Sequence, residues 1–168
     1  MKLLTIDKEN LFKYIEVFRN FQYKEYREKE LIDKTILDIK KNRSIAYLLN
    51  VDKKYLGFIA ISASRLKTDI DGIPAIEIDY LFIDKQYRKQ EFKKLDNLKA
   101  SIYLLNLIIN NVSKELQKKL GLKVVILYPD KQNLNLINFY HKLGFHKQKI
   151  ILWDGKKRKI EYWMIKPI

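Results

Sequence analysis

The first half of the chain alternates short apolar runs with segments of helical periodicity. Apolar residues spaced three or four apart follow Asp7, a common helix-capping residue type, and recur over residues 31–41, which predicts two helices. Runs rich in β-branched and aromatic residues predict strands between these helices and after them. These strands are expected over residues 2–6, 44–51, 55–65 and 75–83.

The second half predicts a strand enclosed by two helices, followed by a terminal hairpin. A long apolar stripe begins at Leu98 and stops at Gly121, a residue suited to a left-handed helix cap. The run 123–128 has the pattern of a buried strand, and residues 133–144 form a second amphipathic helix. The tail predicts strands at 149–153 and 160–165, turned around Asp154–Gly155. This order indicates one α/β (α+β) domain over residues 1–168 on a mixed sheet.

Composition narrows the classes of protein that this pattern permits. The 168 residues are 47% hydrophobic and 12% aromatic, which is enough for one well-formed core. The sequence has no apolar run long enough to cross a bilayer, so we expect a cytoplasmic protein without a membrane partner. The absence of cysteine excludes disulfides and a thioester on the protein, and two histidines make a metal site improbable.

The chain is strongly basic, with a formal net charge of +14. Such a charge attracts polyanions, including nucleotide phosphates, RNA and acidic proteins. Lysine is abundant along the whole chain, so solvated lysines on helix surfaces explain much of the charge equally well. The charge therefore permits RNA binding without selecting it.

Two carboxylates interrupt the apolar strand predicted over residues 75–83. Strict alternation places Glu77, Asp79, Leu81 and Ile83 on one face of this strand. Burial and a neighbouring like charge would both raise the pKa of a carboxylate there, toward the range useful to a general base. The alternative is a wet face on which both acids pair with lysines.

A basic segment follows that strand, and an Asn–Tyr pair occurs later in the chain. Residues 85–89 read Lys-Gln-Tyr-Arg-Lys and precede a helix, an arrangement that suits either a phosphate site or a solvated loop. Tyr140 follows Asn133 by about two helical turns, so their side chains share a helix face. A tyrosine there is either a core residue with a wet hydroxyl or a proton donor.

These segments together resemble the GNAT superfamily of acyl-coenzyme A N-acyltransferases. The strand and loop at residues 78–88 resemble the family's central strand and phosphate loop, and residues 133–145 resemble its later motif. The resemblance implies a single domain with a mixed, mostly antiparallel sheet of about six to seven strands and about four helices. It also implies direct transfer of an acetyl group from acetyl-coenzyme A to an amine, without a metal.

The resemblance also implies roles for individual residues. Glu77 matches the base that deprotonates the acceptor ammonium, and Tyr140 matches the donor that protonates the departing thiolate. The strand segment Leu81, Phe82 and Ile83 would bind the pantetheine arm through exposed backbone, with an N–H near Leu81 polarising the thioester carbonyl. The remaining coenzyme-binding positions are Arg88, Lys89, Ala100, Ser101 and Asn133.

The phosphate loop departs from the family pattern because it contains no glycine. Glycine lets backbone approach a phosphate closely, whereas residues 88–95 all carry a Cβ and include the anionic Glu91. The distance from Arg88 to Gly121 also exceeds the family's usual loop and helix. Either an insertion moves the helix entry to residues 97–101, where Ala100 and Ser101 replace part of the missing glycine, or the site is degenerate.

Two functions from different classes follow. The first is an N-acetyltransferase whose acceptor is a small-molecule or peptide amine, or an amine carried by RNA such as aminoacyl-tRNA. The second is a non-catalytic module that binds acyl-coenzyme A or RNA. The family binds its acceptor near the segments that correspond here to residues 18–26 and 153–162. An edge strand in the tail could support a homodimer.

Overall fold

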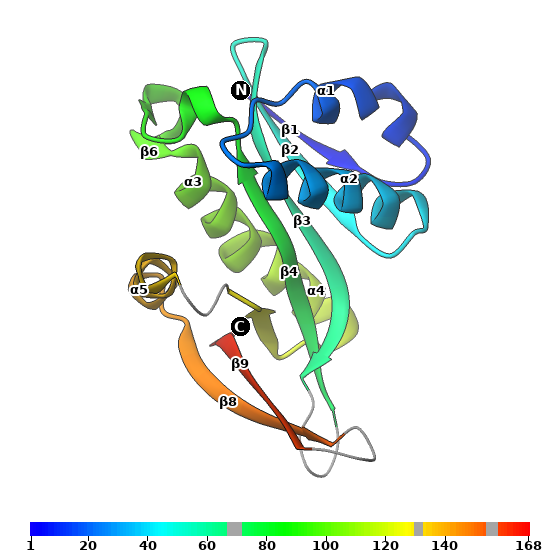
Figure 1. Ribbon diagram of the computed structural model, residues 1–168, viewed down its shortest axis with the longest axis vertical. Coiled ribbons are helices and arrows are strands. Elements are labelled where there is room, and N and C mark those ends of the chain that lie inside the picture. The colour runs from blue at the N-terminus through cyan, green and yellow to red at the C-terminus, as the bar shows by residue number, and fades with distance from the viewer. Residues whose placement is uncertain (67–71, 130–132, 154–157) are drawn as a thin grey trace. The chain divides into compact units, whose positions relative to one another are not determined.

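The computed structural model of the protein describes residues 1–66, 72–129, 133–153 and 158–168. The predicted turn residues Asp154–Gly155 lie outside the described residues. The chain separates into two compact units, which are drawn together in Figure 1. The first unit comprises Met1–Ser62 and Asp79–Asn111, and the second comprises Ala63–Ile78 and Val112–Ile168.

An antiparallel ladder forms the centre of the first unit. It contains β1 (Lys2–Ile6), β2 (Ile45–Val51) and the beginning of β3 (Lys54–Leu66). The turn between β2 and β3 places Asp52 and Lys53 in the left-handed region, with φ of 50° and 64°. Two consecutive positive φ angles match the right-handed twist of hairpin strands, so the predicted hairpin is confirmed.

Two helices cover one face of this ladder. They are α1 (Ile15–Arg19) and α2 (Tyr26–Lys40), and Figure 1 shows both on the same side of β1–β3. Their buried residues pack with strand residues in one core cluster. That cluster contains Ile6, Leu11, Phe18, Phe21, Ile32, Ile39, Ala46, Leu48, Phe58, Ala60 and Phe82.

The structure corrects the boundaries of both helices. The first one is not continuous, because Tyr14 has φ −122° and separates a 3-10 turn at Leu11–Lys13 from α1. The second one begins at Tyr26, five residues before the expected start at Leu31. The first turn of α2 is mostly polar and contains no fully buried residue, so it lacks the apolar periodicity by which a helix is recognised in a sequence.

The second unit is built on the two terminal strands. β7 (Val124–Leu127) pairs antiparallel with β9 (Arg158–Pro167), which pairs antiparallel with β8 (His146–Trp153). Two helices, α4 (Ser113–Leu120) and α5 (Leu134–Lys142), belong to the same unit. Gly121 ends α4 with φ 66°, as its position in the sequence predicted.

The strand β4 (Ile73–Ile83) runs through both units, as does β3. The seven strands follow the order β1-β2-β3-β4-β7-β9-β8, and the pairing of β4 with β7 is parallel. With helices α1 and α2, the continuous run of α3 (Ala100–Leu107) into α4, and α5, this is the predicted α+β fold with a mixed, mostly antiparallel sheet. A π-helical turn at Ile108–Val112 links α3 to α4.

The glycine-free segment after β4 forms a folded hairpin. Glu91–Phe92 and Leu98–Lys99 pair as a small antiparallel hairpin, β5 and β6. Its turn uses Asp96 and Asn97 in the left-handed region, with φ of 56° and 59°. Asp and Asn tolerate this conformation better than other non-glycine residues, which explains how the turn forms without glycine. The helix then begins at Ala100, within the entry predicted for an insertion.

Candidate functional site

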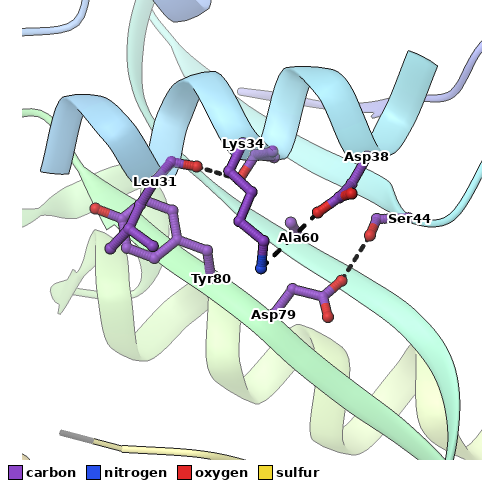
Figure 2. Close-up of a pocket in the computed structure, with 8 residues that line it drawn as sticks. Leu31, Lys34, Asp38, Ser44, Ala60, Asp79 and Tyr80 are labelled. Carbon is purple, nitrogen blue, oxygen red and sulfur yellow. Dashed lines mark hydrogen bonds and ion pairs between the residues drawn. The ribbon is translucent and has the colours of Figure 1, made fainter. Parts of the chain in front are cut away.

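The two carboxylates of β4 accept hydrogen bonds from serine hydroxyls. Ser44 Oγ donates to Asp79 Oδ2 at 2.7 Å (Figure 2). Ser62 Oγ donates to Asp79 Oδ1 at 2.8 Å. Ser64 Oγ donates to Glu77 Oε2 at 2.9 Å. The sequence contained a signal for this arrangement, because Ser62 and Ser64 share one face of an otherwise apolar strand.

Asp79 lies at a small polar hollow beneath α2. The hollow is lined by Leu31, Lys34, Thr35, Asp38, Ser44, Ala60, Asp79 and Tyr80. Burial raises the pKa of Asp79, and the two serine hydroxyls and the Lys34 ammonium oppose this effect without cancelling it. Asp38 raises the pKa further, so this carboxylate holds a proton more readily than a free aspartate.

Strict alternation along β4 is wrong at one point. Asp79 and Tyr80 are consecutive, yet both line the hollow beneath α2. Tyr80 and Phe82 also pack against the core cluster under the helices. Asp79 therefore lies on the same side as Tyr80 and Phe82, and not on the opposite side with Leu81 and Ile83 as expected. An irregularity of the β-bulge type places successive side chains on one face in this way.

The end of β4 extends beyond its parallel partner. The pairing with β7 covers Ala75–Ile78, whereas β4 continues to Ile83. Phe82 is buried, and its ring centroid lies 5.3 Å from that of Phe21. A Cβ added at Gly57 would lie 2.2 Å from the Phe82 carbonyl oxygen, so only glycine permits β3 to approach β4 this closely.

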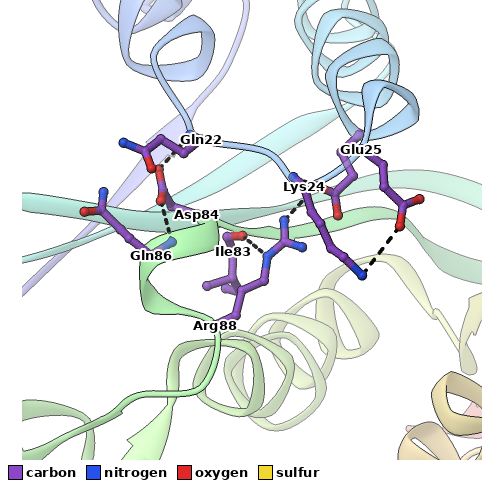
Figure 3. Close-up of polar contacts among 8 residues, drawn as sticks. Gln22, Lys24, Glu25, Ile83, Asp84, Gln86 and Arg88 are labelled. Carbon is purple, nitrogen blue, oxygen red and sulfur yellow. Dashed lines mark hydrogen bonds and ion pairs between the residues drawn. The ribbon is translucent and has the colours of Figure 1, made fainter.

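Asp84 closes the strand with a set of backbone hydrogen bonds. The residue is only 3% exposed. Its Oδ2 accepts from the Gln22 backbone N–H at 2.9 Å, and its Oδ1 accepts from the Gln86 N–H at 3.0 Å (Figure 3). The Lys85 N–H in turn donates to the Gln22 carbonyl oxygen at 2.9 Å. Sequence reasoning missed this residue, although an aspartate directly after an apolar strand is a common capping signal.

The guanidinium of Arg88 is engaged within the protein. Its Nε donates to the Ile83 carbonyl oxygen at 2.9 Å, and its Nη2 contacts Glu28 Oε2 at 2.8 Å. The guanidinium carbon also lies 5.4 Å from the centroid of the Phe82 ring. Glu28 was not identified from the sequence, because a glutamate in the first turn of a helix is common and distinguishes nothing.

The other candidate phosphate ligands lie at the surface and at the start of α3. Lys89 is exposed, Ala100 is buried and Ser101 is half-buried. Lys99 at the N-cap of α3 makes no side-chain capping hydrogen bond, and the first turn contains no acidic residue. The backbone N–H groups at the start of α3 and the helix dipole therefore face no competing carboxylate from the first turn.

Tyr140 and Asn133 occupy the two ends of α5. Asn133 caps the helix, since its Oδ1 accepts from the Leu136 N–H at 3.0 Å. Tyr140 is 7% exposed, and its ring lies 5.4 Å from Phe139 and 5.8 Å from Phe145, measured between centroids. Burial raises the pKa of Tyr140 to about 12. The phenol is therefore protonated at neutral pH.

The Tyr140 hydroxyl has no hydrogen-bond partner within the part of the chain that the structure describes. Among the same residues, every fully buried side-chain polar atom has a partner. The hydroxyl is therefore not completely sealed from solvent, although the ring is buried. A polar group held in this way is available to a ligand.

The predicted site residues divide between the two units. Leu81, Phe82, Ile83, Arg88, Lys89, Ala100 and Ser101 belong to the first unit, and Glu77, Asn133 and Tyr140 belong to the second. Within the first unit, the structure brings Arg88 onto the end of β4 at Ile83 and Phe82. Over the described ranges, no three metal-ligating side chains gather, and no helix is long and apolar enough to span a bilayer.

Sequence comparison finds no matching family model and no matching curated protein, whereas structural comparison finds clear similarity. A Tyr-to-Phe mutant of the AtaT toxin, bound to acetyl-coenzyme A and the C-terminus of the antitoxin AtaR, has a TM-score of 0.68 at 16% identity, with 99% of this chain and 92% of that chain covered. PaiA N-acetyltransferase from Thermoplasma acidophilum, in complex with coenzyme A, has a TM-score of 0.56 at 20% identity over 100% of both chains. NAA60 from Arabidopsis thaliana, in complex with acetyl-coenzyme A, has a TM-score of 0.58 at 14% identity, with coverage of 99% and 98%.

These similarities define the fold. The chain has the fold of the GNAT N-acetyltransferases, as the residue pattern of β4 and α5 predicted. At 14% to 20% identity, the similarity extends to the architecture and not to the acceptor.

Proposed function

We propose that the protein is an N-acetyltransferase that transfers an acetyl group from acetyl-coenzyme A directly to a primary amine. The observation that carries the proposal is the Tyr140 hydroxyl, which is protonated and without a partner in the described part of the chain. Tyr140 lies in the last turn of α5, the helix whose sequence motif resembles that of the GNAT family. The fold supports the proposal, because similar structures contain acetyl-coenzyme A or coenzyme A.

The reaction balances without a covalent intermediate on the protein. The acceptor nitrogen attacks the thioester carbonyl carbon, the C–S bond breaks, and the acetyl group stays on nitrogen. Glu77 accepts a proton from the acceptor ammonium, directly or through a water. Tyr140 donates its proton to the departing thiolate, and the second proton that the acceptor nitrogen loses as the amide forms returns to Tyr140, directly or through a water. The backbone N–H near Leu81 stabilises the negative charge on the carbonyl oxygen.

Coenzyme binding is assigned to backbone more than to side chains. The pantetheine arm would bond to the backbone of Leu81 and Ile83, beyond the last pair of β4 with β7, where the Ile83 carbonyl oxygen already accepts from Arg88 Nε. The pyrophosphate would accept hydrogen bonds from the start of α3 at Ala100 and Ser101, with Lys89 adding positive charge. Asn133 would contact the coenzyme through its amide nitrogen, because its oxygen caps α5.

Titration calorimetry with coenzyme A and an assay of free thiol release test the proposal. We expect saturable coenzyme A binding, and thiol release from acetyl-coenzyme A that depends on an added amine. The amine panel should contain a polyamine, a peptide N-terminus, a lysine peptide and an aminoglycoside. The absence of both binding and thiol release would contradict the proposal.

The charge of +14 supports a second candidate, in which RNA is the ligand or carries the acceptor amine. A non-catalytic module would bind RNA with steep salt dependence and show no affinity for coenzyme A. An acetyltransferase acting on an RNA-linked amine would bind both and modify the amine. Acetyl transfer to aminoacyl-tRNA is compared with transfer to the free amino acid. Transfer to aminoacyl-tRNA alone supports the acetyltransferase acting on an RNA-linked amine, and no transfer to either supports the non-catalytic module.

A further inference from the structure

Two segments far apart in the sequence are tied together in the first unit. One is the connecting loop, Asn20–Glu25, between α1 and α2. The other is the strand-exit segment, Asp84–Arg88, which follows β4 and corresponds to the start of the proposed phosphate loop. Figure 3 shows polar contacts joining the two segments.

The first part of this connection is reciprocal. Asp84 accepts from the Gln22 N–H, and the neighbouring Lys85 N–H donates to the Gln22 carbonyl oxygen. Both backbone groups of Gln22 are therefore held by the strand-exit segment. Because Asp84 is almost fully buried, moving the connecting loop away would leave a buried carboxylate without one of its donors.

The second part connects the guanidinium of Arg88 with the first turn of α2. Glu28 Oε2 accepts from Arg88 Nη2 at 2.8 Å and from the Lys24 backbone N–H at 2.6 Å. Burial acts to raise the pKa of Glu28, but hydrogen bonds from Arg88 and Lys24 outweigh it and hold the pKa below its usual value. Glu28 thus joins Arg88 to the connecting loop, and we call this set of contacts the clamp.

The clamp leaves Arg88 poorly placed to be a phosphate ligand. Its guanidinium already bonds to Ile83 and Glu28 and stacks on Phe82. A phosphate contact would therefore compete with a carboxylate at 2.8 Å. Lys89, the next residue, is exposed and free of this restriction.

We propose that Arg88 is a positioning residue, which holds the connecting loop on the end of β4 so that coenzyme binding at the strand-exit segment and ordering of the connecting loop are coupled. This inference rests on the proposed function and deepens it. Phosphate binding that fixes the backbone of Asp84–Arg88 would lower the cost of ordering Gln22 and Lys24. By linkage, an ordered loop strengthens coenzyme binding by the same factor.

Amide hydrogen exchange at Gln22 and Lys24 tests the clamp, with coenzyme A as the probe. Wild-type protein is compared with Arg88→Gln, Arg88→Lys, Glu28→Gln and the double variant Arg88→Gln/Glu28→Gln. Arg88→Gln leaves Glu28 as an acceptor, so faster exchange at Lys24 then reports loss of the ion pair and not of the acceptor. Glu25→Gln is the matched control, because Glu25 is an exposed glutamate that pairs only loosely with Lys24, at 3.7 Å.

We expect each clamp variant to accelerate exchange at Lys24 by about tenfold, the factor for one charge-assisted hydrogen bond. Each should also weaken coenzyme A binding, with the double variant no weaker than the single ones, since both act through one contact. Arg88→Lys should show an intermediate effect, because lysine keeps the charge but has one nitrogen where arginine uses two to reach Ile83 and Glu28. Glu25→Gln should change neither quantity.

If Arg88 instead binds phosphate directly, Glu28→Gln should have the opposite effect on coenzyme A affinity. Glu28→Gln would then release Arg88 and tighten coenzyme A binding, while Arg88→Gln would weaken it. That result, unchanged exchange, or faster exchange with unaltered coenzyme affinity would each overturn the proposal. If wild-type protein does not bind coenzyme A, the proposed function fails, whereas exchange in the free protein still decides whether Arg88 holds the loop.

Discussion

The polar groups at the end of β4 and at the end of α5 differ in whether they have hydrogen-bond partners within the protein. After β4, Asp84 and Arg88 are each engaged with named partners inside the first unit. At the end of α5, Tyr140 is surrounded by rings and its hydroxyl lacks a partner in the described chain. Groups that the protein satisfies itself hold its structure, whereas a group left unsatisfied is free for a ligand. The comparison assigns a structural role to the side chains of Asp84 and Arg88, and it supports the proposed role of Tyr140 as proton donor.

The strongest way to test this contrast is Tyr140→Phe. We expect turnover to fall by about 100-fold or more, since a positioned proton donor contributes at least that factor. The melting temperature and coenzyme A affinity should remain close to wild type, because the lost hydroxyl has no partner in the described residues. Tyr14→Phe, a half-buried tyrosine packed against the first core cluster, is the matched control. Unchanged turnover would remove Tyr140 from the mechanism.

Gly57→Ala should disrupt the packing of β3 against the end of β4. The new Cβ would lie 2.2 Å from the Phe82 carbonyl oxygen and 2.8 Å from the Ile83 Cα, both of which are backbone atoms. We expect a loss of about 3 kcal/mol in the free energy of unfolding, measured in urea. Gly121→Ala is the control, because no atom lies within 4 Å and only its φ of 66° opposes the change. It should cost about 1 to 2 kcal/mol.

Asp84→Asn should destabilise the first unit with little change in shape. An amide offers one oxygen where the carboxylate offers two, so one of the two backbone N–H donors would face an NH2 group. We expect a loss of about 2 kcal/mol in urea unfolding. Asp52→Asn changes an exposed aspartate paired with Lys94 and should leave the unfolding midpoint unchanged. Equal behaviour of the two variants would deny Asp84 its structural role.

Asp79→Asn should have the smallest effect on the free energy of unfolding. The sign of this effect should depend on pH. Burial raises the folded-state pKa of Asp79, so the group contributes stability below its unfolded pKa of about 3.8 and loses it as pH rises through the folded pKa. The asparagine variant should therefore gain stability relative to wild type as pH rises from 4 toward 7. Thermal melts across this range measure the difference. A relative loss over the same range would show that the ionised form is favoured by folding.

Periodicity was sufficient for most of the fold because it reports which side of each element is buried. The ends of β1, the hairpin around Asp52 and the cap at Gly121 follow from local chemistry, and all agree with the structure. The first turn of α2 and the break at Tyr14 do not, because neither changes the hydrophobic pattern. Alternation failed at Asp79 because the side that a strand residue faces also depends on its contacts with neighbouring segments, here Ser44 and Ser62.

The sequence by itself determined the α+β class, the resemblance to the GNAT fold and the positions of Glu77, Tyr140 and the glycine-free segment, because spacing and residue type are local properties. Only the tertiary structure decided what each polar group meets. It placed Arg88 against Glu28, 60 residues away, and left the Tyr140 hydroxyl without a partner in the described chain. Contacts at such separation depend on how the elements pack, and no local pattern in the sequence records them.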